Sequence, residues 1–335
     1  MRTSAVVAGL GSALPPNRVT NDDLTKELDT SDEWITSRTG VRQRFTVPVG
    51  MATSDLAVVA AQRALSSSGM TTVEAVVLAT STPDHPCPAT APDVATRLGL
   101  AQVAAFDVAA VCAGFVYALA TAAGLIESRV VNSALVIGAD TFSTILHPQD
   151  RTTRVIFGDG AGAVVLRAGN AAIDGALLAF DLGSDGTGRD LITVWGGGAR
   201  QRSSRIVPAA ADLHFAMQGK AVFNRAVQCM GTSVAATVRS VGWDVTDLDL
   251  LVAHQANARI LRAIGQQLDL DEDQVAVNLD RVGNTVAASI PLALADAVAT
   301  GRLRPGHHVA LAAFGGGLTW GSAVLRWPDI PVAME

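Results

Sequence analysis

The sequence predicts an α/β fold that is built from two similar halves. Short apolar runs recur along the 335-residue chain and alternate with stretches of helical character. Such runs are typical of buried strands, and strands that alternate with helices are typical of an α/β protein. The runs that we expect to form strands are residues 75–81, 133–139, 161–166, 248–253, 309–314 and 322–327.

An internal repeat suggests that the halves arose by duplication. The order strand, helix, strand, helix, strand runs from residue 72 to 139 and again from 247 to 314. Cys112 and Asn284 stand at matching helix starts, and His254 follows a strand end. Ligands of open α/β sheets bind outside the carboxyl ends of the strands, so we expect these three side chains to converge near a pseudo-twofold axis. The predicted halves are 1–170, with the cysteine, and 171–335, with the histidine and asparagine.

Composition excludes several classes of protein. Apolar residues make up 49% and aromatic residues 4%, so the core is expected to consist of Ala, Val, Leu and Ile. A net charge of −6 argues against nucleic-acid binding, which needs a concentrated basic face. No leader peptide and no apolar run of about 20 residues is present, so we expect a cytoplasmic protein without a membrane segment. Three cysteines without CxxC spacing predict neither a disulfide framework nor a metal site.

Three polar residues are candidates for catalysis. Cys112 lies among small residues where a helix begins, a position that favours thiolate, although free cysteines often only pack in a core. His254 ends an apolar strand, where a structural hydrogen bond is an equally good explanation. Asn284, in a Gly-Asn-Thr sequence, could be a turn or cap residue. The three together favour a catalytic site more strongly than any one of them alone.

Two glycine-rich stretches and one partial match to a nucleotide-binding motif are also present. Residues 314–321 follow a strand and could bring backbone N–H groups close to an oxyanion, or form a plain turn. Residues 157–163 are equally ambiguous. Residues 9–14 resemble half of a dinucleotide fingerprint but lack its third glycine, and the chain contains no phosphate loop, HExxH or GxSxG motif.

Taken together, several motifs resemble those of β-ketoacyl-acyl carrier protein synthase III and its polyketide-priming relatives. The similar stretches extend essentially from end to end: residues 30–35 with 38–42, 112–115, 157–163, 254–257, 283–285 and 314–317. The resemblance implies a thiolase-like αβαβα sandwich that forms a homodimer. It also implies acyl-CoA and malonyl-acyl carrier protein as substrates, with no cofactor and no metal.

The resemblance assigns roles to the three candidates. It implies that Cys112 accepts the acyl group and that His254 and Asn284 stabilise the enolate formed when the malonyl group loses CO2. The N–H groups of Cys112 and Gly316 would form the oxyanion hole, and Phe314 would keep the site apolar.

Further residues match substrate-binding positions of the family. Trp34 and Arg151 match positions that sandwich the adenine of coenzyme A, and Arg38 matches one near the pantetheine entrance. Phe157 and Asn257, within the shared motifs, are also expected at the substrate site.

The sequence departs from the family pattern where relatives carry lysines for the acidic carrier protein. Uncharged Asn224, Gln266 and Gln267 stand at those positions. Arginines nearby are therefore the expected docking residues: Arg225, Arg259 and Arg262.

Cys87 marks a second departure. It precedes Pro88 where some relatives have a bulky aromatic residue that closes the partner subunit's acyl pocket. The smaller side chain leads us to expect a longer or branched starter.

Three other functions compete with condensation. A thiolase-fold acyltransferase would move the acyl group to an alcohol or amine, but it needs a base and not the paired donors His254 and Asn284. A nicotinamide-dependent oxidoreductase is suggested only by the glycine motifs. A noncatalytic partner subunit is disfavoured because such subunits usually lose the nucleophile, and Cys112 is present.

Overall fold

The computed structural model describes residues 3–333 and contains two large sheets. The strands of the six-stranded sheet, in spatial order, are β14 (Val332–Ala333), β1 (Thr3–Ala13), β7 (Gly160–Asn170), β6 (Ser133–Asp140), β4 (Ala75–Ala79) and β5 (Ala104–Val108). Those of the four-stranded sheet are β11 (Leu250–Ala253), β12 (His308–Gly315), β13 (Thr319–Arg326) and β8 (Leu177–Ser184).

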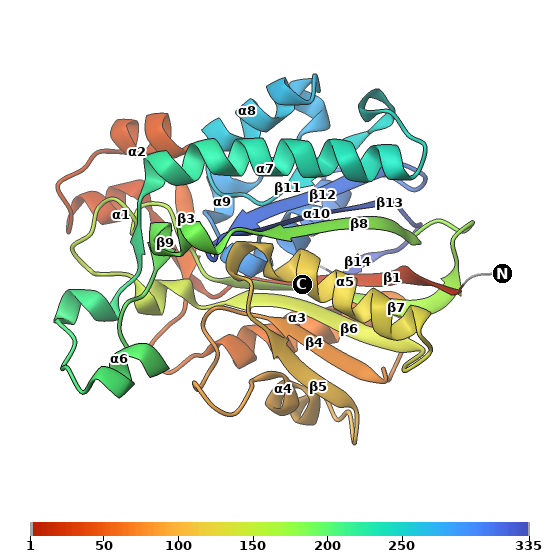
Figure 1. Ribbon diagram of the computed structural model, residues 1–335, viewed down its shortest axis with the longest axis horizontal. Coiled ribbons are helices and arrows are strands. Elements are labelled where there is room, and N and C mark those ends of the chain that lie inside the picture. Colours follow the sequence, from red (N-terminus) through yellow and green to blue (C-terminus); the bar gives the residue numbers. More distant parts are fainter. Residues whose placement is uncertain (1–2, 334–335) are drawn as a thin grey trace.

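Helices and sheets alternate in five layers (Figure 1). Two helices, α5 (Gly114–Glu127) and α10 (Ser289–Ala299), form the middle layer and pack on both sheets. The outer face of the six-stranded sheet is covered by α3 (Thr53–Ser68) and α4 (Ala91–Arg97). The outer face of the other sheet is covered by α7 (Gly219–Ser240) and α8 (Ala258–Gln267). This arrangement is the expected αβαβα sandwich.

The two sheets repeat one topology. The order β1-β7-β6-β4 corresponds to β8-β13-β12-β11, with one parallel pair and two antiparallel pairs in each. β5 has no full counterpart: Val275 makes one parallel bridge to Leu251, and the Asn278 N–H then donates to the Gln255 side chain. The prediction of a short strand before Asn284 is therefore wrong. The Asn278 N–H bonds to the Gln255 side chain and not to the backbone of β11, so the strand pairing stops after one bridge. The division at residue 170 falls between β7 and β8 and stays a prediction.

Both middle helices begin with the same unusual backbone. Val111 and Val286 have positive φ angles of 46° and 53° and open the short 3-10 turns η1 (Val111–Ala113) and η7 (Val286–Ala288). A positive φ is rare for a β-branched residue, so the shared feature fixes the alignment of the halves. Cys112 corresponds to Ala287, and Asn284 lies three residues before it, so the expected match of Cys112 with Asn284 is corrected.

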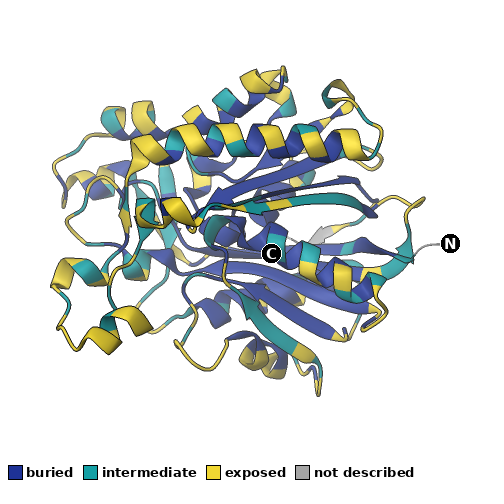
Figure 2. Cartoon of the chain, in the orientation of Figure 1, coloured by how far each residue is buried: buried dark blue, intermediate teal, exposed yellow. Residues whose placement is uncertain are grey.

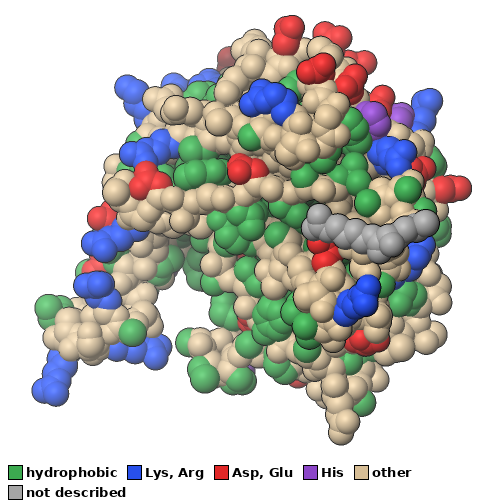
Figure 3. All heavy atoms as spheres, turned by 45° about the vertical axis from the view of Figure 1, so that its right-hand side comes forward, with side chains coloured by type: hydrophobic (Ala, Val, Ile, Leu, Met, Phe, Trp, Pro, Cys, Tyr) green, Lys and Arg blue, Asp and Glu red, His purple; other side chains and the backbone are tan. Residues whose placement is uncertain are grey.

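Smaller elements gather at one end of the sandwich. A strand pair, β2 (Asn17–Thr20) and β3 (Gln43–Thr46), lies near three short helices: α1 (Asn21–Thr25), α2 (Asp32–Thr39) and α9 (Leu279–Val282). A second pair, β9 (Ile192–Thr193) and β10 (Ala216–Met217), is joined by a projecting segment that contains α6 (Ala199–Ser204). Figure 3 shows Lys or Arg and hydrophobic side chains on that projection.

The core consists mainly of small aliphatic residues, as the composition predicts. The central strands of both sheets are buried, the edge strands β5 and β8 are mostly intermediate, and exposed positions follow the outer faces of the outer helices (Figure 2). Gly11 allows α3 to approach β1, because a Cβ there would lie 2.3 Å from the amide nitrogen of Ala64. All six expected strands are found, with small shifts at their ends. Within residues 3–333, no helix has the length and apolar character needed to cross a membrane.

Candidate active site

Cys112 lies in the turn η1, directly before α5 in the middle layer. Its side chain is partly buried, and the thiol faces an apolar surrounding. Burial raises the pKa of the Cys112 thiol, and the nearby Asp140 carboxylate raises it further. The position at a helix start is as predicted, but burial opposes the thiolate that this position was expected to favour.

His254 follows the last residue of β11. Its N–H continues the ladder by donating to the Ala312 carbonyl at 2.7 Å, and the side chain is only 2% exposed. Burial lowers the pKa of His254 to about 3. Its Nδ1 is buried and has no hydrogen-bond partner. The imidazole is therefore neutral near pH 7 and can donate one hydrogen bond.

Asn284 lies between α9 and η7. Its N–H donates to the Ile156 carbonyl and its own carbonyl accepts from the Gly158 N–H, both at 2.9 Å. Its Oδ1 accepts from the Val286 N–H at 3.0 Å. The side-chain oxygen is thus engaged, which leaves the Nδ2 group as the donor available for a ligand.

One cavity of about 40 Å³ brings these three residues together. Cys112, His254 and Asn284 all line it, although they lie far apart in the sequence. Most of its other walls are apolar, from Val111, Phe142, Phe157, Ile192, Phe215, Met217, Val222, Ala226, Met230, Ala256, Ile260 and Phe314. The expected convergence at the strand ends is therefore found, and a charged group in this cavity would be poorly solvated.

Three aromatic rings close one side of the cavity. Phe142 lies 4.8 Å from Phe157 and 4.9 Å from Phe215 between ring centroids, and Phe157 lies 5.1 Å from Phe215. Only Phe157 among them was predicted as a site residue. The cluster limits the volume beside the Cys112 sulfur and therefore the size of a group that could bind there.

The glycine-rich strand end passes close to the cysteine turn. A Cβ at Gly315 would lie 2.7 Å from the Cys112 nitrogen, and a Cβ at Gly316 would lie 3.3 Å from a methyl carbon of Val111. The Thr319 hydroxyl donates to the carbonyls of Ala110 and Gly316 at 3.1 Å each, which ties the two segments together. Backbone N–H groups of both segments can thus serve one oxyanion.

Two buried polar residues that sequence reasoning missed support this geometry. Asp140, at the end of β6, accepts from the N–H groups of Ser81 and Ala287, at 2.7 and 2.9 Å. Burial raises the pKa of Asp140 to about 7, although its hydrogen bonds act in the opposite direction. An acidic residue directly after an apolar strand was the signal that could have revealed it.

The second is Gln255, which is fully buried beside His254. Its N–H donates to the Ser289 hydroxyl, and its side-chain amide donates to the carbonyls of Ala253 and Ala276. Together with the bond from Asn278, these contacts fix the strand end that carries His254. Gln255 lies within the motif of residues 254–257, but the sequence alone does not indicate this role.

Trp34, Arg38 and Arg151 form one cluster at the surface. The guanidinium carbons of Arg38 and Arg151 lie 5.7 and 5.2 Å from the Trp34 ring centroid. Asn257 caps α8 by accepting from the Arg259 N–H, and it donates to the Arg38 carbonyl at 3.1 Å. The cluster offers an aromatic face and two cations, which suit a nucleotide.

The remaining predicted residues lie outside the cavity. Cys87 is exposed in the loop between β4 and α4. Arg225 forms an ion pair with Asp185, and the Arg259 guanidinium donates to the Ser37 carbonyl. Arg262 borders a groove of about 260 Å³ along α8. Within residues 3–333, no cluster of His, Cys, Asp or Glu has the geometry of a metal site.

Comparison with known proteins agrees with this geometry. A family model described as 3-oxoacyl-[acyl-carrier-protein (ACP)] synthase III matches residues 106–186, and the corresponding C-terminal model matches residues 238–327. β-Ketoacyl-[acyl-carrier-protein] synthase III 5 of Streptomyces coelicolor is 59% identical over 98% of this chain and 99% of its own length. The Pseudomonas aeruginosa synthase III is 55% identical over the full length of both chains.

Solved structures give the same result. The 3-oxoacyl-(acyl carrier protein) synthase III of Pseudomonas aeruginosa PAO1 superimposes with a TM-score of 0.92 at 55% identity, covering 98% of this chain and 99% of the other. The priming β-ketosynthase of the R1128 polyketide pathway superimposes with a TM-score of 0.91 at 30% identity, covering 98% of each. The fold is that of the thiolase-like condensing enzymes, which belong to the transferase class. The chain belongs to the β-ketoacyl-acyl carrier protein synthase III family, which starts fatty acid or polyketide synthesis.

Proposed function

We propose that this enzyme condenses an acyl-CoA starter with malonyl-acyl carrier protein and releases a β-ketoacyl-acyl carrier protein. The observation that carries the proposal is the shared cavity of Cys112, His254 and Asn284. A nucleophile alone would suit any acyl transfer. The two neutral donors beside it suit decarboxylation, which needs stabilisation of an enolate oxygen and no strong base.

The first step transfers the acyl group to the enzyme. The Cys112 sulfur attacks the thioester carbon of acyl-CoA, a new C–S bond forms, and the bond to the coenzyme A sulfur breaks. The N–H groups of Cys112 and Gly316 stabilise the oxyanion of the tetrahedral intermediate. The thiol proton leaves with coenzyme A. Because burial raises the pKa of Cys112, this proton moves as the sulfur attacks.

The second step forms the carbon–carbon bond. His254, through Nε2, and Asn284, through Nδ2, donate hydrogen bonds to the malonyl thioester oxygen. The carboxylate then leaves as CO2, and its bonding electrons form the enolate. Apolar walls, Phe314 among them, favour loss of the poorly solvated carboxylate. The enolate carbon attacks the acyl-Cys112 carbonyl, a C–C bond forms, and the cysteine sulfur leaves as a thiolate, which takes up one proton from solvent and restores the thiol. Neither step transfers electrons to an acceptor, so no cofactor is part of the proposal.

Substrate delivery is assigned to the surface residues. Trp34 and Arg151 would hold the adenine of coenzyme A, with Arg38 next to the pantetheine arm. Phe157 and Asn257 belong to the same substrate path. Carrier docking is proposed for three arginines on α7 and α8: Arg225, Arg259 and Arg262. Arg225 contributes least, because its charge is already paired with Asp185.

The proposed assembly is a homodimer in the cytoplasm. In the single chain, β5 is the edge strand of the six-stranded sheet, so its free backbone groups can pair with a second copy. In such a dimer, Cys87 would approach the partner's acyl pocket, where its small size would admit a longer or branched starter. The halves 1–170 and 171–335 would each contribute to one active site.

Product analysis tests the reaction. Purified enzyme is mixed with acyl-CoA and malonyl-acyl carrier protein, and the carrier is analysed by mass spectrometry together with CO2 release. The proposal requires a β-ketoacyl carrier and one CO2 per product. Transfer of the acyl group to an added alcohol or amine, with the malonyl group intact, would instead establish the competing acyltransferase activity.

A further inference from the structure

Arg44 is a buried cation that the proposed reaction does not use. It lies in β3, and its side chain is 1% exposed. Burial lowers its pKa only to about 10, so the guanidinium stays charged near neutral pH. No carboxylate within residues 3–333 forms an ion pair with it, and its Nε has no hydrogen-bond partner. A buried charge without a carboxylate partner is costly, and among the described residues the Arg44 side chain donates hydrogen bonds to backbone carbonyls.

These carbonyls belong to two neighbouring segments. The guanidinium donates from Nη2 to the Val155 carbonyl at 2.7 Å and from Nη1 to the Val19 carbonyl at 3.3 Å. The planar group thus ties the segment at residue 155 to the strand pair β2–β3. Lysine could not reproduce this geometry, because its ammonium group does not hold two N–H donors in fixed directions within one plane.

The stem of Arg44 packs against both backbone segments that meet at Asn284. A Cβ at Gly158 would lie 3.0 Å from the Arg44 Cβ, and a Cβ at Gly283 would lie 3.1 Å from it. The two glycines therefore leave only enough space for the arginine stem. Arg44 is therefore packed closely against the backbone on both sides of Asn284.

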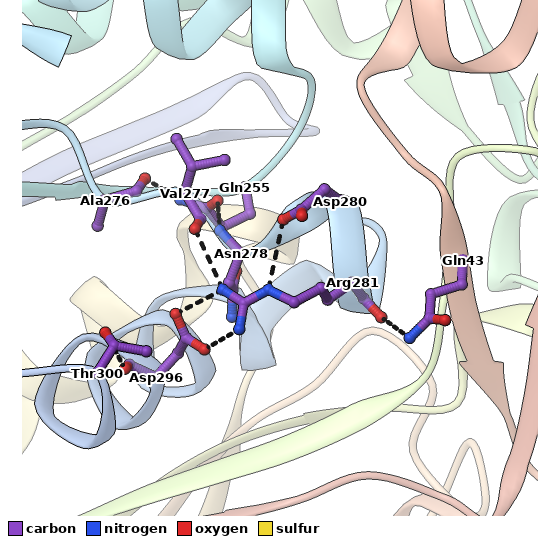
Figure 4. Close-up of polar contacts among 9 residues, drawn as sticks. All are labelled: Gln43, Gln255, Ala276, Val277, Asn278, Asp280, Arg281, Asp296 and Thr300. Atoms are coloured by element: carbon purple, nitrogen blue, oxygen red, sulfur yellow. Dashed lines mark hydrogen bonds and ion pairs between the residues drawn. The ribbon is translucent and has the colours of Figure 1, made fainter. Parts of the chain in front are cut away.

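The same two segments are the ones that hold Asn284. Its N–H donates to Ile156, and its carbonyl accepts from Gly158, so its backbone is clamped to residues 156–158. β3 is also fastened to α9 just before Asn284. Figure 4 shows the side-chain amide of Gln43 donating to the Arg281 carbonyl, at 3.1 Å. Arg44 thus contacts the strand β2, the segment at residues 155–158 and the backbone at Gly283.

We propose that Arg44 is a positioning residue for Asn284, which holds residues 155–158 so that the Asn284 amide faces the catalytic cavity. This inference rests on the proposed function, in which Asn284 acts in decarboxylation and not in acylation of Cys112. Loss of Arg44 therefore impairs the second step more than the first. The Asn284 amide takes no part in acylation, although Phe157 in the held segment also lines the cavity beside Cys112. The oxyanion segments that serve the first step are tied together by Thr319, whereas the Arg44 guanidinium donates to Val19 and Val155.

Two rates measured separately test the proposal. Intact-protein mass spectrometry follows acylation of Cys112 by acyl-CoA, and a single-turnover assay follows condensation of the acylated enzyme with malonyl-acyl carrier protein. Arg44→Met removes the guanidinium and keeps an unbranched stem. Arg18→Met, at an exposed arginine on the paired strand β2, is the matched control. Asn284→Ala shows the effect of losing the amide itself.

For Arg44→Met we expect condensation to fall about 100-fold, as for a misplaced catalytic group, while acylation, which uses the same Phe157 wall, falls by no more than about tenfold. Arg18→Met should change neither rate. Equal losses in both steps, or no loss in condensation, would overturn the proposal. If Arg44→Met does not fold, Arg44→Lys supplies the same test, with a smaller loss that is again greater in condensation than in acylation. A wild-type enzyme that acylates but never condenses would refute the proposed function, which is a different outcome.

Discussion

The charge state of His254 is the property of the site that the structure specifies most sharply. Burial lowers its pKa to about 3, whereas an unperturbed imidazole has a pKa near 6.5. At pH 5 the neutral form of His254 should then exceed the charged form by roughly 100 to 1, while an ordinary histidine would be roughly 97% charged. Lowering the pH from 8 to 5 should therefore leave His254 unprotonated.

Nuclear magnetic resonance of enzyme labelled with 13C and 15N at histidine measures this directly. The chain has six histidines, and the spectrum of His254→Gln identifies the signal that belongs to His254. We expect that signal to stay constant from pH 8 to 5, with nitrogen shifts of the Nε2–H tautomer that can donate to an enolate. A midpoint near pH 6 to 7 for the His254 signal would refute the argument, because a cationic imidazole would then have to be considered.

Three further predictions follow from neighbouring contacts. Gly315→Ala should lower the acylation rate of Cys112 about 100-fold or more, because the new methyl group would lie 2.7 Å from the Cys112 nitrogen. Gly124→Ala, in a helix position with free space, is the control and should leave that rate unchanged. Phe215→Ala should improve acylation by an acyl-CoA two carbons longer about tenfold relative to the shorter one, since two buried methylenes are worth about 1.6 kcal/mol, and should cost about 3 kcal/mol or more of folding stability. An unchanged chain-length profile would show that the three aromatic rings do not set the pocket. In urea unfolding, wild type should lose about 2 kcal/mol between pH 7 and 5 that His254→Gln does not lose, because the unfolded chain binds the histidine proton more tightly above a folded pKa of about 3. Equal pH dependence in both proteins would contradict the buried neutral state.

Much of the fold could be predicted from the sequence because its signals are local. Apolar runs of the right length marked the strands, and the repeated element order indicated two halves. The meeting of Cys112, His254 and Asn284 also followed from the repeated order of elements, because Cys112 and His254 follow strands of two matching sheets whose carboxyl ends lie at the same end of the sandwich. The exact alignment of the halves could not be predicted. It depends on the positive φ angles of Val111 and Val286, and valine does not indicate such an angle in a sequence.

The supporting polar residues could not be predicted because their roles depend on distant contacts. Asp140 acts through the Ala287 N–H, 147 residues away, and Arg44 acts through the Val155 carbonyl, 111 residues away. The prediction of a thiolate at Cys112 was also incomplete, because it left burial out. A helix start is visible in the sequence, but the burial that raises the thiol pKa arises only when the cavity walls assemble.

The most direct test of the account follows the mass of the intact enzyme through one reaction cycle. Wild type and Cys112→Ala are mixed with a panel of acyl-CoAs, and malonyl-acyl carrier protein is then added. The account predicts that wild type gains one acyl mass, that the malonyl carrier removes it as β-ketoacyl product, and that the variant gains none. An acyl mass that persists after malonyl-carrier addition, or acylation of Cys112→Ala, would contradict it.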